Sequence, residues 1–288
     1  MDAKRPETSI LIPSIDGSRD GMLPRLLEQL KSQTYQDFEV IIKVGDNRQG
    51  RAINNAAGEA KGDYIVIMDD DIFLGHDTLL ERLVAAVRSE PKIGMGGASV
   101  VVWDKANWLQ RRVMIEVPRY AAPVVSEITD SDLAFHGCCI LRKDVFFAVG
   151  GERENIIRGL DPDLRMRLRG AGYRVALIPH TWFYHLPPAT FGKFVKKFFR
   201  NGQGSSYIQL MHPEFIYETH TGEGEFVERR GLAYRIFRYP LRLAGHLIHG
   251  RLIGFTADCA YAAGVLTGYV KYGWQKRARA RAASSGRE

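Results

Sequence analysis

Short apolar runs alternate with amphipathic segments in the first part of the amino-acid sequence. The runs lie at 9–13, 38–42 and 64–68, and residues typical of turns follow each of them. Between the runs, 24–33 carries leucines at helical spacing and 51–61 is rich in alanine. The order strand, helix, strand, helix, strand is typical of a parallel sheet covered on both faces, and it places the three strand ends at one edge.

The third apolar run ends in three adjacent carboxylates, Asp69, Asp70 and Asp71. Such groups repel one another and cannot enter the core unpaired. At the edge of an α/β sheet, where ligands bind, they would suit a hard divalent cation that holds phosphate oxygens. The alternative is an acidic loop that caps a helix beginning near His76, although a single carboxylate is enough for a cap.

Composition indicates which partners and which cellular compartment the protein suits. The net charge of +7 favours anionic partners such as nucleotide phosphates or acidic lipids. The three cysteines, Cys138, Cys139 and Cys259, fit neither a disulfide framework nor a Cys-x-x-Cys metal site, which favours a reducing, cytosolic setting. The N-terminal residues have no apolar signal-peptide core. The two common glycine-rich phosphate loops are absent, so phosphate would be held by a metal and by basic side chains.

The second half of the chain is expected to continue the α/β pattern. Residues 93–130 read as mixed β structure, with Trp103 and Trp108 either in the core or facing a sugar. Further strands are expected at 135–141, 172–179 and 182–185. A helix is expected at 161–170, and its opening aspartates, Asp161 and Asp163, could simply cap it.

Six segments and two closing residues, in this order, resemble the family 2 glycosyltransferases of the GT-A fold. They are Ile10–Pro13, Gln33–Val40, Gly50–Ala56, Gly62–Asp71, Val149–Gly151 and Asp161–Arg167 together with Gly170–Val175, closed by Pro179 and His185. The resemblance covers about 8–186. It implies a GT-A catalytic domain over 1–188, which is a Rossmann-like, mostly parallel mixed sheet covered by helices. Residues 1–100 would form its donor half and 101–188 its acceptor half.

The resemblance also implies an activity and a site. The activity is inverting transfer of a sugar from a nucleotide diphosphate donor to an acceptor hydroxyl. By position, Asp71, with Asp69 and His185, would bind Mg²⁺ or Mn²⁺, and Asp161 would be the general base. The residues implied for contact with the nucleotide sugar are Pro13, Ile15, Asp46, Arg51, Asn54, Asp69 and Asp70.

Two positions depart from the family pattern. Leu160 stands where the family carries a glutamate before the base, which affects acceptor orientation or tuning of the base. The second strand continues into Lys43-Val44-Gly45-Asp46, so Asp46 is displaced from the place of the family's base-reading aspartate.

The remaining residues, 189–288, are expected to form a basic helical region. Residues 191–210 interleave lysine and phenylalanine, as in a helix that binds an anionic membrane or packs on the catalytic domain. The segment 252–270 is nearly long enough to span a bilayer, but Asp258 makes a lipid-exposed span costly. We therefore expect a helical hairpin at the membrane interface or in an oligomer contact. This favours a peripheral enzyme on the inner face of the cell membrane, with a glycan or lipid-linked acceptor and no nucleic-acid partner.

Two other functions remain as alternatives. One is a phosphotransferase or phosphatase that uses Asp69 and Asp71 as nucleophile and acid, although in such enzymes the motif usually follows the first strand. The other is a non-catalytic relative that binds nucleotide sugar or glycan, which the leucine at position 160 makes conceivable.

Overall fold

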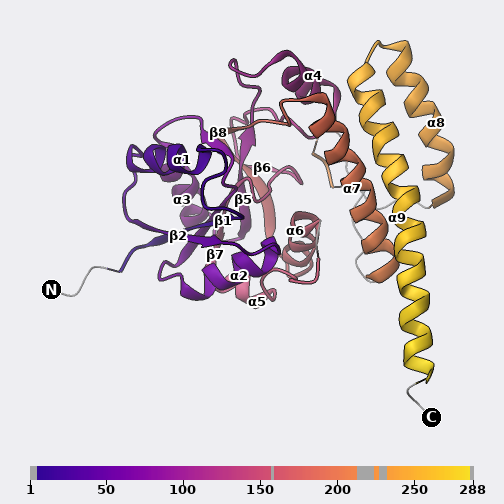
Figure 1. Cartoon of the computed structure of the whole chain (residues 1–288). Helices are drawn as coiled ribbons and strands as arrows, with labels where there is room; N and C mark the ends of the chain where they lie inside the picture. The colour runs from indigo at the N-terminus through magenta and orange to yellow at the C-terminus, as the bar shows by residue number, and fades with distance from the viewer. Residues whose placement is uncertain (1–4, 157–158, 213–223, 227–231, 286–288) are drawn as a thin grey trace. The chain divides into compact units, whose positions relative to one another are not determined.

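The structure, a computed structural model, describes residues 5–156, 159–212, 224–226 and 232–285 (Figure 1). The described residues divide into two compact units. Unit 1 takes those within 1–105, 119–186 and 218–227, and unit 2 takes those within 106–118, 187–217 and 228–288.

Unit 1 is built on one mixed sheet. Its strands are β1 (Thr8–Ser14), β2 (Phe38–Val44), β3 (Tyr64–Met68), β4 (Ile72–Leu74), β5 (Ile93–Val100), β6 (Thr129–Asp130), β7 (Cys138–Arg142) and β8 (Arg174–His185). Their order is β2-β1-β3-β7-β5-β8-β4, with β6 on β8. The first three strands are parallel, as the sequence predicts, and β7 runs antiparallel to β3 and β5.

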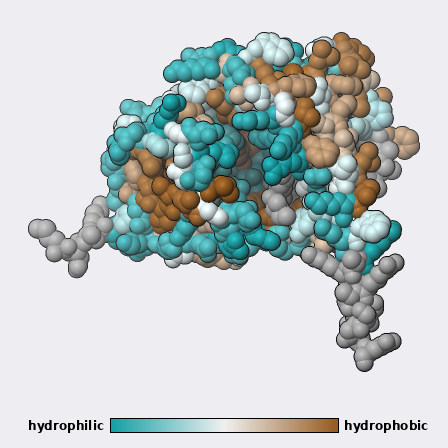
Figure 2. All heavy atoms as spheres, in the orientation of Figure 1, coloured by the Kyte–Doolittle hydropathy of each residue, from teal (hydrophilic) through white to brown (hydrophobic). Residues whose placement is uncertain are grey.

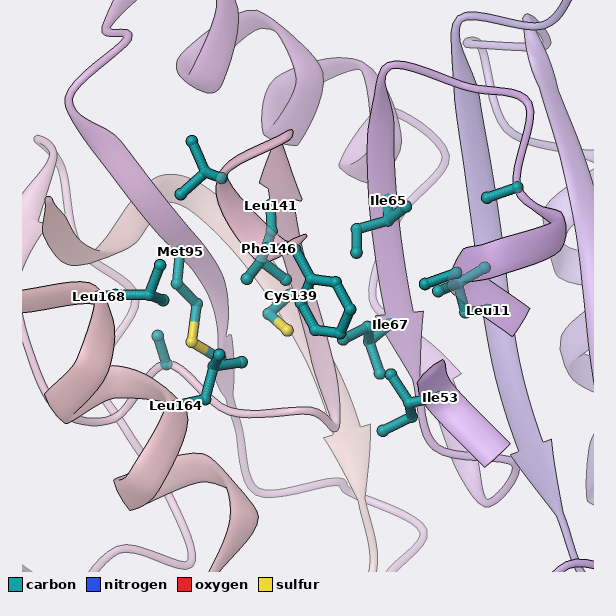
Figure 3. Close-up of a cluster of buried hydrophobic side chains, with 14 of the residues drawn as sticks. Leu11, Ile53, Ile65, Ile67, Met95, Cys139, Leu141, Phe146, Leu164 and Leu168 are labelled. Carbon is teal, nitrogen blue, oxygen red and sulfur yellow. The ribbon is translucent and has the colours of Figure 1, made fainter. Parts of the chain in front are cut away.

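Helices cover both faces of this sheet. They are α1 (Met22–Lys31), α2 (Gln49–Glu59), α3 (Leu79–Ser89), α5 (Lys143–Ala148) and α6 (Leu160–Gly170). On one face the ring of Phe146 lies among side chains of β3 and β7, with Ile53 of α2 on one side and Leu164 of α6 on the other (Figure 3). The buried leucines of α1 and α3 belong to none of this cluster and cover the other face. The core therefore fixes where the carboxyl ends of β1, β2 and β3 lie.

Two segments differ from the sequence prediction. Residues Trp108–Glu116 form helix α4 within a region expected to be mixed β structure. A capping box explains its start, because the side chains of Asn107 and Gln110 each bond the other residue's backbone N–H. The two β segments expected at 172–179 and 182–185 are one strand, β8, in which His180 takes a positive φ of 54°.

Unit 2 contains α4 and three further helices, α7 (Phe191–Met211), α8 (Leu232–Ile248) and α9 (Leu252–Ser285). A Cβ added at Gly202 of α7 would lie 2.1 Å from the carbonyl oxygen of Tyr261, and one at Gly264 of α9 would lie 2.0 Å from that of Phe199. Glycine is therefore required where these two helices touch. None of the helices that the structure describes combines the length and hydropathy that a membrane span needs.

Gly62, just before β3, offers a test of how tightly the sheet is packed. A Cβ there would lie 2.6–2.8 Å from backbone atoms of Glu7, Thr8 and Ser9. Because backbone cannot move aside as a flexible side chain can, we expect Gly62→Ala to lower the stability of unit 1 by about 1–3 kcal/mol. The measurement is the midpoint of thermal or urea unfolding.

The matched control is Gly58→Ala in α2, where nothing lies within 4 Å of the added Cβ. It should leave stability unchanged or raise it by up to about 1 kcal/mol, because alanine is the better helix former. Equal midpoints for the two variants would contradict the packing described above.

Candidate active site

The three carboxylates after β3 lead directly into another strand. Asp69 donates its backbone N–H to the carbonyl of Gly137 at 3.2 Å, and β4 begins at Ile72. Strand β4 runs antiparallel to β8, and this pairing sets Ile72 opposite His185. The acidic stretch therefore caps no helix, since α3 begins only at Leu79, and the capping alternative is wrong.

Asp69, Asp71 and His185 form a compact group of metal-ligand type. One ligand atom from each residue lies within 4.8 Å of the others, and Nε2 of His185 lies 3.3 Å from Oδ1 of Asp71. Two carboxylates and an imidazole, partly exposed, suit Mn²⁺ or Mg²⁺ and leave room for oxygen ligands from a substrate. The sequence prediction that these three residues converge agrees with this geometry.

Asp70 turns away from that group. Its Oδ2 accepts a hydrogen bond from Oγ of Ser14 at 2.6 Å, and its side chain is buried. Burial raises the pKa of Asp70, while Ser14 and Arg19 oppose that rise. The residue thus ties the end of β3 to the end of β1.

Arg19 is a member of the site that the sequence reasoning missed. It follows the turn after β1 with a positive φ of 51°, and its Nη2 lies 2.6 Å from Oδ2 of Asp71. Burial alone would raise the pKa of Asp71, but His185 and Arg19 outweigh it and hold that pKa well below its usual range. The available signal was its place in the loop after the first strand, whose end was expected at this crevice.

Asp69 is the carboxylate of the metal-ligand group whose pKa is raised. Burial raises the pKa of Asp69 to about 6, and the nearby charges of Asp71 and Asp161 add to the rise while His185 opposes it. Gln49, at the first residue of α2, donates a 3.0 Å hydrogen bond to its Oδ1. Gln49 is a second residue that the sequence reasoning did not single out.

Asp161 lies in the first turn of α6, and its side chain is 30% exposed. Its Oδ1 accepts a 2.7 Å hydrogen bond from the backbone N–H of His136. Burial acts to raise the pKa of Asp161, but the charges of His136 and Arg165 outweigh it, so the pKa is lowered. A carboxylate that is ionised and partly open to solvent is equipped to accept a proton.

The other predicted donor-contact residues lie near the ends of β1 and β2. Asp46 and Arg51 pair with each other at 2.6 and 2.8 Å, and Ile15 is 58% exposed in the loop after β1. Pro13 lies within β1 opposite Lys43. Asn54 uses its side chain to hold the backbone of Glu152, at 2.8 Å through both its amide nitrogen and its oxygen.

An aromatic cluster adjoins the metal-ligand group. The ring of Trp103 lies 4.5 Å from that of Phe73 and 5.3 Å from that of Tyr184, centroid to centroid. Phe73 and Tyr184 are near neighbours in sequence of Asp71 and His185. Trp103 is half-buried, which gives this part of the site a partly accessible apolar surface.

The mixed sheet with its flanking helices has the GT-A fold. Residues 11–148 match a family model described as glycosyl transferase family 2, so this part of the chain carries a family 2 glycosyltransferase domain. The protein is therefore an enzyme of the glycosyltransferase class. A search of curated proteins finds no match.

A solved structure with a TM-score above 0.5 has the same fold. A mannosyltransferase from Pyrobaculum calidifontis, in complex with GDP-Man and Mn²⁺, superposes with a TM-score of 0.52 at 15% identity, over 98% of this chain and 81% of that one. GalNAc-T7 with UDP, GalNAc and Mn²⁺ gives 0.47 at 12% identity, over 74% and 51%. Residues 1–349 of S. aureus TarS give 0.44 at 16% identity, over 73% and 72%.

The contact between Arg19 and Asp71 predicts how the site responds to a metal without nucleotide. The guanidinium occupies an oxygen that a cation would use, so Arg19→Met should raise the affinity for Mn²⁺ alone, by up to about fivefold for the loss of one partly exposed ion pair. Titration followed by electron paramagnetic resonance of free Mn²⁺ measures this.

Arg25→Met is the control, because Arg25 is an exposed residue of α1. It should bind Mn²⁺ as the wild type does. A lower affinity in Arg19→Met than in the wild type would show that Arg19 supports the cation site rather than competing with it.

Proposed function

We propose that the protein is an inverting glycosyltransferase that moves a sugar from a nucleotide diphosphate to an acceptor hydroxyl. The observation that carries this proposal is the coexistence of two acidic centres in unit 1. One is the group of Asp69, Asp71 and His185, and the other is the half-open carboxylate of Asp161. A leaving group and a nucleophile need separate assistance in a single displacement, and two centres supply it.

The first centre is assigned to the donor diphosphate. Asp71, His185 and Asp69 would hold Mg²⁺ or Mn²⁺ there. When bound, such a cation offsets the negative charge that develops on the departing diphosphate. Arg19 is 46% exposed at its side chain and would turn from Asp71 to the phosphate oxygens. Its release would also remove the competition for the Asp71 oxygen.

The ends of β1 and β2 are assigned to the nucleoside. Pro13, Ile15, Asp46, Arg51 and Asn54 lie there or in the helix that follows, and Asp70 braces the crevice through Ser14. GDP-Man is bound by the Pyrobaculum mannosyltransferase, so GDP-mannose heads the panel of donors to test. UDP-glucose, UDP-galactose and UDP-N-acetylglucosamine complete that panel.

Asp161 is assigned to the acceptor as the general base. Both of its contacts with His136 go to Oδ1, so Oδ2 is left to accept the proton of the attacking hydroxyl. The side chain of Leu160 has no polar group to share this task and is buried. The base therefore takes its orientation from another part of unit 1.

Two substitutions separate the centres. Asp71→Asn should abolish binding of GDP or UDP in the presence of Mn²⁺, measured by calorimetry. Asp161→Asn should retain that binding and lower kcat by about a hundredfold or more, the usual contribution of a general base. Asp63→Asn, an exposed aspartate paired with Arg5, is the control.

Inversion is read from the anomeric configuration of the product by NMR. Transfer with retained configuration, or unchanged kcat in Asp161→Asn, would refute the mechanism. A trapped phosphoaspartate at Asp69 or Asp71 would favour the phosphotransferase alternative instead.

We also propose that unit 2 binds an anionic membrane surface. Helix α8 exposes large apolar side chains on one face, at Tyr234, Phe237, Leu241 and Ile248, and Phe237 is 77% exposed. Arg238 and Arg242 are exposed on the same helix. Figure 2 shows apolar surface gathered over the region of α8 and α9. Such a surface favours a lipid-linked or cell-surface glycan acceptor and a peripheral location at the inner face of the cell membrane.

Vesicle sedimentation tests this second proposal. The double variant Phe237→Asp, Leu241→Asp should lose binding to phosphatidylglycerol vesicles by more than tenfold, because each large apolar side chain contributes about 1.5–3 kcal/mol on burial. Vesicles of phosphatidylcholine alone should bind the wild type weakly.

The control variant is Ile115→Asp, Leu266→Asp, which changes two equally exposed residues of α4 and α9 in the same unit. Loss of binding in both variants alike would contradict a docking face on α8. Self-association without vesicles that only the α8 variant abolishes would instead make this face an oligomer contact.

A further inference from the structure

Three consecutive residues before β7 touch three different residues of the site. The ring of Phe135 lies over that of His185, with centroids 6.4 Å apart. His136 binds Asp161 through its backbone N–H, and the carbonyl of Gly137 accepts the N–H of Asp69. This short segment links the metal-ligand group to the proposed base within unit 1.

His136 lies between two carboxylates. Its Nε2 is 2.9 Å from Oε1 of Glu152, and its Nδ1 is 3.2 Å from Oδ1 of Asp161. The imidazole is buried, with 2% of the residue exposed. A neutral imidazole has one N–H, whereas the imidazolium carries an N–H on each of the two nitrogens that lie near these carboxylates.

Glu152 is placed for this contact and for no other described cation. Asn54 bonds both the N–H and the carbonyl of Glu152, each at 2.8 Å. Gly151 before it has a φ of 62°, and a Cβ there would lie 2.8 Å from Oδ1 of Asn54. The carboxylate of Glu152 is buried, and within the described residues its ion-pair partner is His136. A buried carboxylate without a partner would be strongly destabilising.

The charges around His136 agree with this geometry. Burial lowers the pKa of the imidazole, but the carboxylates of Asp161 and Glu152 outweigh it and raise the pKa to about 9, with Asp69 adding to the rise. Arg165 is the other cation that faces Asp161. The imidazole is therefore protonated at neutral pH, and its positive charge lies next to Asp161.

We infer that His136, held by Glu152, is the positioning residue of Asp161. It fixes Oδ1 through two contacts and directs Oδ2 toward the acceptor hydroxyl. Its charge keeps Asp161 ionised, so the base is ready before the acceptor arrives. This inference rests on the proposed role of Asp161 as base, and it gives that base the orienting partner that the leucine at position 160 does not supply.

The first test reads the protonation of His136 without any activity. Long-range ¹H–¹⁵N NMR of the full chain, labelled at histidine, should show one imidazole protonated on both nitrogens at pH 7.5 and losing a proton near pH 9. The signal is assigned by its loss in His136→Gln, or by its displacement to lower pH in Glu152→Gln if the first variant does not fold. A neutral His136 at pH 7.5 would overturn the inference.

The second test uses turnover of the most active sugar nucleotide of the panel. His136→Gln should lower kcat at least tenfold, with the donor KM unchanged within twofold. Because the charge of His136 lowers the pKa of Asp161, its removal should move the acidic limb of the kcat–pH profile to higher pH. Substitution of a residue with only a structural role would leave the acidic limb of kcat at the same pH.

His76→Gln is the control, since His76 is a partly buried histidine of unit 1 that bonds Thr78. It should leave kcat and its pH profile as in the wild type. If Asp161→Asn abolishes turnover but His136→Gln leaves kcat and its acidic limb unchanged, the inference about His136 fails while the proposed role of Asp161 stands. If Asp161→Asn keeps full turnover while His136 is doubly protonated, the proposed base fails instead.

Discussion

The repulsion among three adjacent carboxylates at the end of a buried strand organises unit 1. Each of them is turned to a different partner: Asp69 to Gln49, Asp70 to Ser14, and Asp71 to Arg19 and His185. The partners come from three directions, namely the end of β1 and its loop, the start of α2, and the end of β8. Satisfying three like charges thus draws together segments that are far apart in the chain. The crevice they form is the one in which a diphosphate and its cation would be bound.

The site also holds two cationic side chains that differ in their exposure to solvent. Arg19, which contacts Asp71, has a 46% exposed side chain, whereas the imidazole of His136, which contacts Asp161, is buried. An exposed cation and a buried cation suit different tasks. Under the proposed function, Arg19 would contact the donor phosphates, and His136 would keep the carboxylate of Asp161 ionised.

The sequence was sufficient for much of the fold and for part of the site. The strand and helix periodicities of the first hundred residues, together with the acidic end of β3, located the crevice, and the family resemblance added Asp161 and His185. The sequence was insufficient for residues whose role in the site depends only on a partner brought near by the fold. Nothing local to Gln49 or His136 separates them from surface or core residues, because their partners lie 20 and 25 residues away in the sequence. Helix α4 was missed because its capping box sits in a region whose glycines and tryptophans favoured β structure.

The glycines of α7 and α9 have a consequence for how unit 2 can rearrange. Gly202, Gly264 and Gly268 each lie against backbone atoms of the opposite helix, and Ser206 bonds the carbonyl of Val265. Sliding α9 along α7 by a single residue would bring a side chain into space that has no room for a Cβ. The two helices are therefore locked in register and must translate or tilt as one body. Among the described residues of this unit, the turn between α8 and α9 lies outside this locked pair, and Gly250 adopts a φ of 62° there.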